Sequence, residues 1–344
     1  MTDARGWLAR IRALELPGTF RVMNVCGGHE RSITMAGLRG ALPSQVELIP
    51  GPGCPVCVCP EEDLYAAIQL ARRGDVIVAA FGDMLRVPCN APKSEPRSLE
   101  QAKAAGADIR PIASPMEAVQ IAREQADKRI VFFAAGFETT TAPVASMLVE
   151  GVPDNLLLLL SGRLTWPAVA MLLESTEPGF DALIAPGHVA TVMGSSEWEF
   201  VPEKHGIPSA IAGFKADSLL AAIYSTLRQL NDDRAFLDNC YPELVRPEGN
   251  PTARRHLQQA MEVVDANWRG VGAIPASGFC LGHGYEALDA RRLFPDYADD
   301  ARKRAGQMPP GCDCARVVLG KVYPDECRLY GCLLYTSDAA DDAS

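Results

Sequence analysis

Two cysteine motifs near the amino terminus define the chemistry that this chain could perform. The first runs from Cys26 to Glu30 and reads Cys-Gly-Gly-His-Glu. The second places three thiols within six residues: Cys54, Cys57 and Cys59. A Cys-x-x-Cys pair suits either a reversible disulfide or half of a tetrahedral metal site, because two intervening residues allow the sulfurs to meet. Sulfur chemistry is therefore the first hypothesis.

The composition of the chain narrows its class and its partners. The 344 residues are 48% apolar, which is enough for two or three domains that each bury a core. Lys and Arg number 33 against 43 for Asp and Glu, so the formal net charge is −10. This balance argues against nucleic acid or an anionic membrane surface as a partner.

The amino-terminal residues and the apolar runs indicate the cellular location of the protein. Residues 1–20 carry charges throughout and predict an amphipathic helix instead of a signal peptide. The longest apolar runs, such as residues 156–160, are far shorter than the roughly 20 residues that span a bilayer. We therefore expect a soluble cytoplasmic protein. In a reducing compartment the 11 cysteines are better explained as metal ligands or redox groups than as structural disulfides.

Short apolar segments alternate with helical patterns and predict the secondary structure. Strands are expected at residues 21–25, 46–50, 76–81, 109–113, 129–135, 156–160, 182–185 and 209–213. The clearest helices are expected at residues 61–73, 115–125, 166–174 and 216–230. This alternation favours parallel sheets covered by helices on both faces, and so an α/β fold. In such sheets, ligands bind where loops leave the carboxyl ends of the strands.

The pattern changes after residue 231 and indicates how the chain divides. A helix is expected at residues 252–268, and a loop rich in Gly and Pro at residues 270–284. We expect two Rossmann-like parallel-sheet α/β domains and a smaller carboxyl-terminal domain. The expected bounds are residues 1–120, 121–235 and 236–331, followed by a tail at residues 332–344.

Five loops that follow predicted strands carry glycine and polar residues. They are Cys-Gly-Gly-His-Glu at 26–30, Gly-Pro-Gly-Cys-Pro-Val-Cys at 51–57, Gly-Asp-Met-Leu-Arg-Val-Pro at 82–88, Gly-Phe-Glu-Thr-Thr at 136–140 and Pro-Gly-His-Val at 186–189. In this order they resemble the motifs of the HypD family of hydrogenase maturation factors, and the similarity extends to about residue 331. Each motif alone is weak, whereas the ordered set is specific.

The resemblance implies a scaffold on which an iron atom acquires cyanide and carbon monoxide ligands before delivery to a nickel-iron hydrogenase. It also implies two partners, HypC sharing the iron and HypE donating cyanide. Cys26 would hold the iron, because low-spin iron with diatomic ligands prefers thiolate. Gly27 and Gly28 would let the chain approach the metal, while His29 and Glu30 would supply a proton relay or an outer hydrogen bond. The alternative is a simple turn with Cys26 as an ordinary buried thiol.

Cys54 and Cys57 resemble the dithiol of thioredoxin-like proteins and are expected to transfer electrons. Cyanide delivered as a thiocyanate requires two reducing equivalents, which a dithiol supplies as it becomes a disulfide. Structural zinc is the competing explanation, because Cys-x-x-Cys is also a common half-site. Zinc needs two more ligands at similar spacing, and the chain has no second Cys-x-x-Cys motif. We therefore favour the redox role, with Cys59 as an auxiliary thiol.

Glu138 and His188 are further candidates for the same cleft. A glutamate directly after a strand often caps the next helix. A histidine in a Pro-Gly-His turn is as often structural as functional. The resemblance to the family favours a functional place for both residues.

The cysteines near the carboxyl end fit the cluster motif of the family only in part. The family binds a [4Fe-4S] cluster through Cys, twelve residues, Cys, six residues, Cys, sixteen residues, Cys. Cys314 and Cys327 fit the first two places, but the third falls on Leu334. The last residues, from Cys332 to Ser344, depart from the family pattern and resemble translated adapter sequence. We therefore expect a truncated, poorly packed cluster domain in which the [4Fe-4S] site is incomplete.

The leading functional prediction is an iron-handling assembly scaffold with a redox dithiol. A thiol-disulfide oxidoreductase acting on a protein partner and a zinc-stabilised interaction protein are the alternatives. Metal content separates the three functions. Iron with infrared bands from cyanide and carbon monoxide indicates the scaffold, and zinc alone indicates the interaction protein. A dithiol without any metal indicates the thiol-disulfide oxidoreductase.

Overall fold

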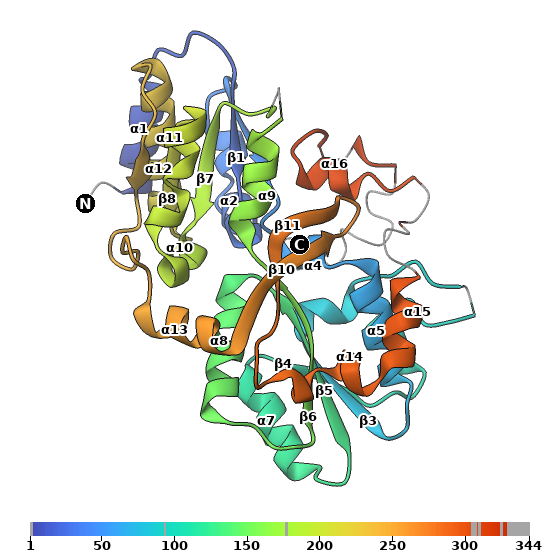
Figure 1. Ribbon diagram of the computed structural model, residues 1–344. Coiled ribbons are helices and arrows are strands. Elements are labelled where there is room, and N and C mark those ends of the chain that lie inside the picture. Colours follow the sequence, from blue (N-terminus) through green and yellow to red (C-terminus); the bar gives the residue numbers. More distant parts are fainter. Residues whose placement is uncertain are drawn as a thin grey trace.

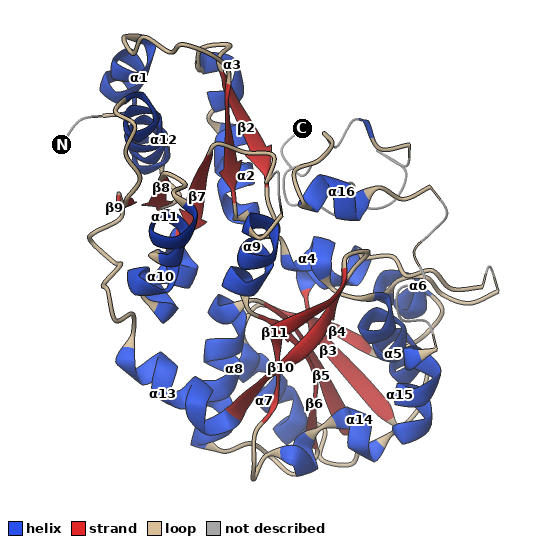
Figure 2. Ribbon diagram, turned by 45° about the horizontal axis from the view of Figure 1, so that its top comes forward, coloured by secondary structure: helices blue, strands red, loops and turns tan. Residues whose placement is uncertain are grey.

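The computed structural model contains two β-sheets, each covered by helices on both faces (Figure 1). It describes residues 3–92, 94–175, 178–303, 308, 311–323 and 326–328. Figure 2 shows the strands of the two sheets as separate groups. The expected α/β class with two Rossmann-like units is confirmed. Among the described helices, none combines the length and apolar character needed to cross a bilayer.

The first sheet has five parallel strands in the order β2-β1-β7-β8-β9. They are β1 (Phe20–Asn24), β2 (Val46–Pro50), β7 (Ala182–Pro186), β8 (Ser209–Ala212) and β9 (Leu237–Asn239). One face packs against α1 (Ala4–Arg12), α2 (Gly27–Met35), α3 (Leu38–Ala41) and α12 (Ala216–Asn231). The other packs against α9 (Thr165–Leu173), α10 (Gly187–Met193), α11 (Phe200–His205) and the short helix η2 (Ser195–Trp198). Val22 and Met23 lie in opposite cores, because successive strand residues face opposite sides.

The second sheet has six strands in the order β10-β11-β6-β5-β3-β4. Four are parallel: β3 (Val76–Phe81), β4 (Ile109–Ile112), β5 (Arg129–Gly136) and β6 (Leu156–Arg163). The antiparallel hairpin of β10 (Met261–Trp268) and β11 (Gly272–Leu281) extends the sheet beyond β6. One face carries α4 (Pro55–Val58), α5 (Glu61–Ala71), α6 (Leu99–Ala104), α14 (Ala290–Leu293) and α15 (Pro295–Arg302). The other carries α7 (Pro115–Glu124), α8 (Glu138–Glu150) and α13 (Pro251–Ala260). The short helices η1 (Gly82–Arg86) and η3 (Glu286–Leu288) follow β3 and precede α14.

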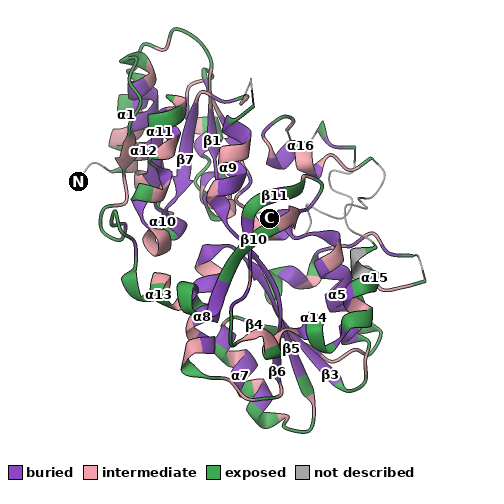
Figure 3. Ribbon diagram, in the orientation of Figure 1, coloured by how far each residue is buried: buried purple, intermediate pink, exposed green. Residues whose placement is uncertain are grey.

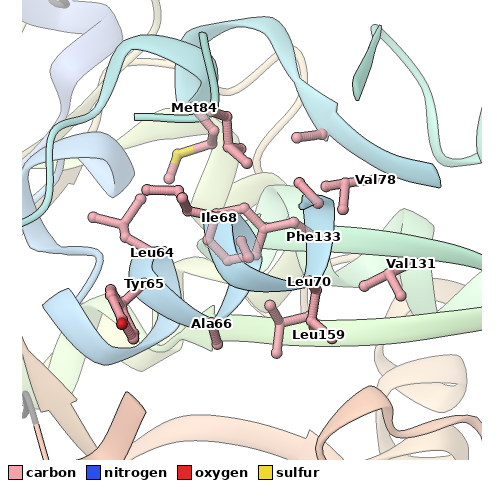
Figure 4. Packing of buried hydrophobic residues seen from close by; sticks show 14 of the residues in the cluster. Leu64, Tyr65, Ala66, Ile68, Leu70, Val78, Met84, Val131, Phe133 and Leu159 are labelled. Carbon is pink, nitrogen blue, oxygen red and sulfur yellow. The ribbon is translucent and has the colours of Figure 1, made fainter. Parts of the chain in front are cut away.

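The helix α5 fixes the position of the second cysteine motif. Its apolar side chains, among them Leu64 and Ile68, pack with Val131 and Phe133 of β5 (Figure 4). The helix opens with three acidic residues, which the positive end of its dipole favours. Because α4 ends at Val58, just before α5 begins, the packing of α5 also holds the cysteines of α4.

The expected bounds at residues 1–120 and 121–235 do not coincide with the two sheets. The first of these segments contributes β1 and β2 to one sheet and β3 and β4 to the other. Residues 121–235 are divided in the same way, with β5 and β6 in one sheet and β7 and β8 in the other. An apolar pattern identifies a strand without naming its neighbour, because pairing depends on packing between distant segments.

Two segments after residue 250 differ from the prediction. The helix expected at residues 252–268 ends at Ala260, and β10 begins at the next residue. The loop expected at residues 270–284 is mostly β11, which pairs with both β10 and β6. The β-branched pair Val263 and Val264 suits a strand, and Gly270 has the positive φ of 69° that the reversal requires.

The described part of the carboxyl-terminal segment packs against the rest of the protein (Figure 3). Its helix α16 (Cys314–Val318) contacts α4, and Val318 shares an apolar cluster with Trp268. Arg21 of β1 donates a hydrogen bond to the carbonyl oxygen of Gly320 at 2.9 Å. The expectation of a poorly packed segment is therefore wrong for residues 311–323. The expected tail at residues 332–344 lies outside the described residues.

Candidate functional site

The two cysteine motifs meet at the carboxyl ends of β1 and β2, which are neighbours in the first sheet. The amide of Gly27 donates a hydrogen bond to the carbonyl oxygen of Gly53 at 3.0 Å. A Cβ atom added to Gly53 would collide with the backbone of Val25 and lie 2.5 Å from the nitrogen of Cys26. A Cβ atom added to Gly27 would lie 3.3 Å from that of Cys54. Glycine at both positions therefore allows the two motifs to lie against one another.

Cys26 is the N-cap of α2 and has an extended backbone, with φ −161° and ψ 120°. The residue keeps some exposed surface, but burial of its thiol raises the pKa to about 11. The backbone amides of His29 and Gly28 lower the pKa in part, whereas Glu30 and Cys54 raise it. Burial thus disfavours the anionic sulfur that the amides favour, and a bound cation would move the balance toward thiolate. This environment suits a ligand of a soft metal ion.

Cys54 and Cys57 bracket the first turn of α4. Cys54 is the N-cap, and Pro55 occupies the first helical position, where its fixed φ is already helical. The two Sγ atoms are 2.6 Å apart. A disulfide bond is about 2.05 Å long, so conversion of this pair needs only a small side-chain movement. Cys57 also packs against an apolar cluster that contains Phe137 and Trp268, which shields one side of the pair from water.

Cys59 faces a buried polar cluster in the second sheet instead of the dithiol. Its Sγ atom lies 3.6 Å from the hydroxyl of Ser161, which donates to Asp63 at 2.5 Å. Asp63 also forms ion pairs with Arg163 at 3.4 Å and Arg291 at 2.7 Å. Burial, together with the charge of Asp63, raises the pKa of Cys59 to about 12. The thiol is therefore protonated and enclosed, and its auxiliary role stays a prediction.

His29 and Glu30 are held by partners inside the protein. His29 is fully buried, with Nδ1 2.8 Å from Oδ1 of Asn24 and Nε2 3.0 Å from the carbonyl oxygen of Ala212. Burial lowers the pKa of His29 to about 4. Glu30 accepts hydrogen bonds from Arg39 at 2.5 Å and from Nδ2 of Asn24 at 2.9 Å. Sequence reasoning missed Asn24, although a polar residue at the end of an apolar strand is a signal that could have found it.

His188 approaches the same area from the end of β7. It lies in the first turn of α10, and its ring centroid is 4.1 Å from that of Phe214. The ring of Phe214 lies 4.8 Å from that of His29 and packs against Gly28. His188 and Phe214 also line a groove of about 1130 Å³ that follows α12. The structure thus places His188 beside the Cys26 motif, with Phe214 between the two histidine rings.

Glu138 follows β5 of the second sheet and caps a helix of the first unit. Its side chain is fully buried, and its carboxylate accepts hydrogen bonds from the amide and the hydroxyl of Thr165, both at 2.7 Å. Thr165 is the first residue of α9, so the carboxylate satisfies one of the unpaired amides at a helix start. Burial raises the pKa of Glu138 to about 7. The contact links α8 to α9, and a role for Glu138 at Cys26 stays a prediction.

Cys314 and Cys327 are both buried in the carboxyl-terminal segment. Cys312 adds a third thiol there, with its Sγ atom 3.0 Å from that of Cys314. Within residues 3–328, apart from the positions that the structure leaves undescribed, no group of three or more Cys, His, Asp or Glu side chains could hold a metal ion. The expected incompleteness of the [4Fe-4S] site stays a prediction. Cys332 lies outside the described residues.

Comparisons with known proteins point to one family. The sequence model of a family described as "HypD: Hydrogenase formation hypA family" matches residues 3–336. The chain is 38% identical to the hydrogenase maturation factor HypD2 of Bradyrhizobium diazoefficiens over 322 residues, which cover 91% of this chain and 82% of that protein. It is 38% identical to the hydrogenase maturation factor HypD of Azotobacter vinelandii over 338 residues, 95% of this chain and 87% of that protein. With the factor HypD of Cupriavidus necator it shares 35% identity over 333 residues, 94% of this chain and 86% of that protein.

Proposed function

The chain belongs to the HypD family, and on this premise we propose that it is a scaffold on which the Fe(CN)2CO moiety of nickel-iron hydrogenase is assembled. In this proposal Cys26 holds the iron, which is the cargo of the reaction, while Cys54 and Cys57 supply electrons. A HypC-like protein would share the iron and a HypE-like protein would donate cyanide. The three similar proteins named above are hydrogenase maturation factors, which supports the maturation role.

The observation that carries the proposal is the contact between the two cysteine motifs. The hydrogen bond from Gly27 to Gly53 and the close approach of Gly53 to the backbone of Val25 hold the loops together. A dithiol can serve chemistry at a metal only if it lies close to that metal or to the group that is delivered to it. A metal on Cys26 would have the Cys54 loop as its direct neighbour.

Cys26 would bind iron as a thiolate. Its pKa of about 11 means that the unliganded thiol is protonated near neutral pH. Binding of a metal cation would release this proton, because only the thiolate is a strong ligand. The amides of Gly28 and His29 would then stabilise the charge that remains on sulfur.

The electron balance assigns a definite step to Cys54 and Cys57. Cleavage of a thiocyanate, R–S–C≡N, into R–S⁻ and CN⁻ consumes two electrons. Oxidation of the dithiol to a disulfide releases two electrons and two protons, so the two half-reactions balance. Cyanide then forms its bond to the iron, and a cellular dithiol must reduce the disulfide before the next turnover. We place this cycle in the cytoplasm, where such reductants are present.

Infrared spectroscopy of the anaerobically purified protein, with and without a HypC-like partner, tests the proposal. We expect stretching bands from cyanide and carbon monoxide in the wild type and their loss in Cys26→Ser, because serine keeps the size but lacks the soft thiolate. Cys280→Ser is the matched control, since Cys280 lies on the hairpin strand β11 of the other sheet and should keep the bands. Full retention of the bands in Cys26→Ser would contradict the assignment.

A thiol-disulfide oxidoreductase that acts on a protein partner is the second candidate function. The separation of 2.6 Å between the sulfurs of Cys54 and Cys57 favours it. Metal analysis distinguishes the two, because an oxidoreductase would carry a titratable dithiol and no iron. Zinc as the single metal would instead support the third candidate, a zinc-stabilised interaction protein.

A further inference from the structure

Asn24 ends β1 two residues before Cys26, and its side chain is fully buried. The side chain lies on the face of the sheet covered by α2 and α12, because Val22, two residues earlier, packs there with Ile33. The backbone carbonyl of Asn24 accepts a hydrogen bond from the backbone amide of Gly51 at 2.8 Å. A buried amide side chain is unfavourable unless its polar atoms are bonded. The partners of this side chain therefore show what it does.

The side chain of Asn24 joins three residues of the first cysteine motif. Its Nδ2 donates to the carbonyl oxygen of Cys26 at 3.0 Å and to Oε1 of Glu30 at 2.9 Å. Its Oδ1 lies 2.8 Å from Nδ1 of His29. Both partners of Nδ2 are acceptors, so the orientation of the amide is determined, and its Oδ1 faces the ring of His29.

Other contacts anchor this motif to the surrounding elements. Nε2 of His29 faces the carbonyl oxygen of Ala212 at the end of β8, and Arg39 of α3 holds Glu30. The carbonyl of Cys26 also accepts the first helical hydrogen bond of α2, from the amide of Glu30 at 3.2 Å. The position of this carbonyl thus determines where α2 starts, and the amides of Gly28 and His29 in its first turn interact with the sulfur of Cys26.

We propose that Asn24 is a positioning residue for the Cys26 thiolate. By holding the carbonyl of Cys26 and the ring of His29, it keeps the sulfur against the first amides of α2 and beside the Cys54 loop. The inference rests on the proposed iron-binding role of Cys26 and adds a residue that acts on the metal only through that thiol.

Alkylation kinetics of the metal-free protein test this role. Asn24→Leu keeps the approximate shape and removes all three polar contacts, so the turn should loosen and expose the sulfur. We expect the rate constant for reaction of Cys26 with iodoacetamide, measured by peptide mass mapping, to rise by at least about tenfold, since the lost contacts include one to a charged group. The matched control is Asn239→Leu. Asn239 also ends a parallel strand, β9, and braces its turn through the amide of Tyr241 at 3.0 Å and the carbonyl of Val245 at 3.2 Å.

The reactivity of the buried Cys59 reports general unfolding in the same experiment. A rise at Cys26 without a rise at Cys59, absent from Asn239→Leu, supports the proposal. If Asn24→Leu accelerates the alkylation of both thiols equally, the two rate constants are measured again in the isosteric Asn24→Asp, and that variant replaces Asn24→Leu as the test. The proposal is overturned if Cys26 reacts in the test variant at the same rate as in the wild type.

Infrared spectra of iron-loaded protein separate this inference from the proposed function. If Cys26 carries the iron, the residual cyanide and carbon monoxide bands of the Asn24 variant should shift, because the hydrogen bonding of the thiolate changes. Absence of these bands from the wild-type protein would contradict the proposed function. A selective effect on the alkylation of Cys26 would still support the positioning of the thiol.

Discussion

At the scale of single residues, burial moves the ionisable groups near the site toward their uncharged forms. It raises the pKa of Cys26 to about 11 and of Glu138 to about 7, and it lowers the pKa of His29 to about 4. A charge in such surroundings is stabilised only by a specific partner. A cationic metal would be the natural partner for the sulfur of Cys26, which agrees with the role that we propose for it.

The pH dependence of stability should change in Glu138→Gln. Folding raises the pKa of Glu138 from 4.5 to about 7, so the folded state favours the protonated carboxyl. This contribution is fully present below pH 4.5 and is lost as the pH rises through about 7. Between those two pH values the free energy of unfolding of the wild type should fall by roughly 3 kcal/mol relative to that of the variant. Urea unfolding at about pH 5 and pH 8 measures the difference, with the exposed Glu203→Gln as control, and parallel pH profiles for wild type and Glu138→Gln would count against it.

Mild oxidation should link Cys54 to Cys57. Their sulfurs are 2.6 Å apart across one helical turn, so little rearrangement is needed. Differential alkylation and peptide mapping should find the two cysteines protected together, while the partly exposed Cys280 stays reactive. If both Cys54 and Cys57 remain open to alkylation after oxidation, the redox role is wrong.

At the scale of elements, the site depends on the contact between two strand ends. β1 and β2 are parallel neighbours, so their carboxyl ends lie at the same edge of the first sheet. β1 leads into α2, which begins after Cys26, and β2 leads into α4, which begins after Cys54. The loop that joins β1 to α2 and the loop that joins β2 to α4 approach so closely that only glycine fits at position 53.

Gly53→Ala should separate the two cysteine motifs. The added methyl group would collide with the backbone of Val25 and lie 2.5 Å from the nitrogen of Cys26, and backbone atoms cannot move aside as a side chain can. We expect the free energy of unfolding to fall by about 1–3 kcal/mol. We also expect the infrared bands from cyanide and carbon monoxide to weaken. Gly40→Ala is the control, because a Cβ atom at Gly40 meets no atom within 4 Å. Equal stability of the two variants would show that the loops adapt.

At the scale of the whole molecule, neither sheet is built from one continuous segment. The chain leaves the first sheet after β2, returns to it at β7, and enters the second sheet again at β10. Both units therefore depend on segments on each side of residue 120. The carboxyl-terminal segment adds a further connection, because α16 contacts α4 and Gly320 lies against Met23 and Ile49 of the first sheet.

Reconstitution with iron and sulfide should leave this chain without a stable [4Fe-4S] cluster. A cubane cluster normally needs four thiolates, and only Cys314 and Cys327 occupy the register of the family. The α/β units should remain folded during the experiment, because each buries its own core. Absorption that corresponds to four irons for each chain, retained after desalting, would show that other residues supply the missing ligands.

Features that depend on neighbouring residues could be predicted from the sequence alone. The strands expected at 46–50 and 76–81 appear with those bounds, and the helix expected at 216–230 is α12, because apolar periodicity and helix-start signals are local. The ordered motifs likewise indicated the family that the comparisons show. The two cysteine loops could be placed at strand ends for the same reason.

The tertiary structure was needed to show which of these local segments become partners. It divided the strands between two sheets, made a strand pair of residues expected as helix and loop, and placed Thr165, 27 residues away, on Glu138. It also gave Asn24 its three contacts with the first cysteine motif. Such partners cannot be read from periodicity, because hydrogen bonding and burial are satisfied by whichever distant segment the packing brings close.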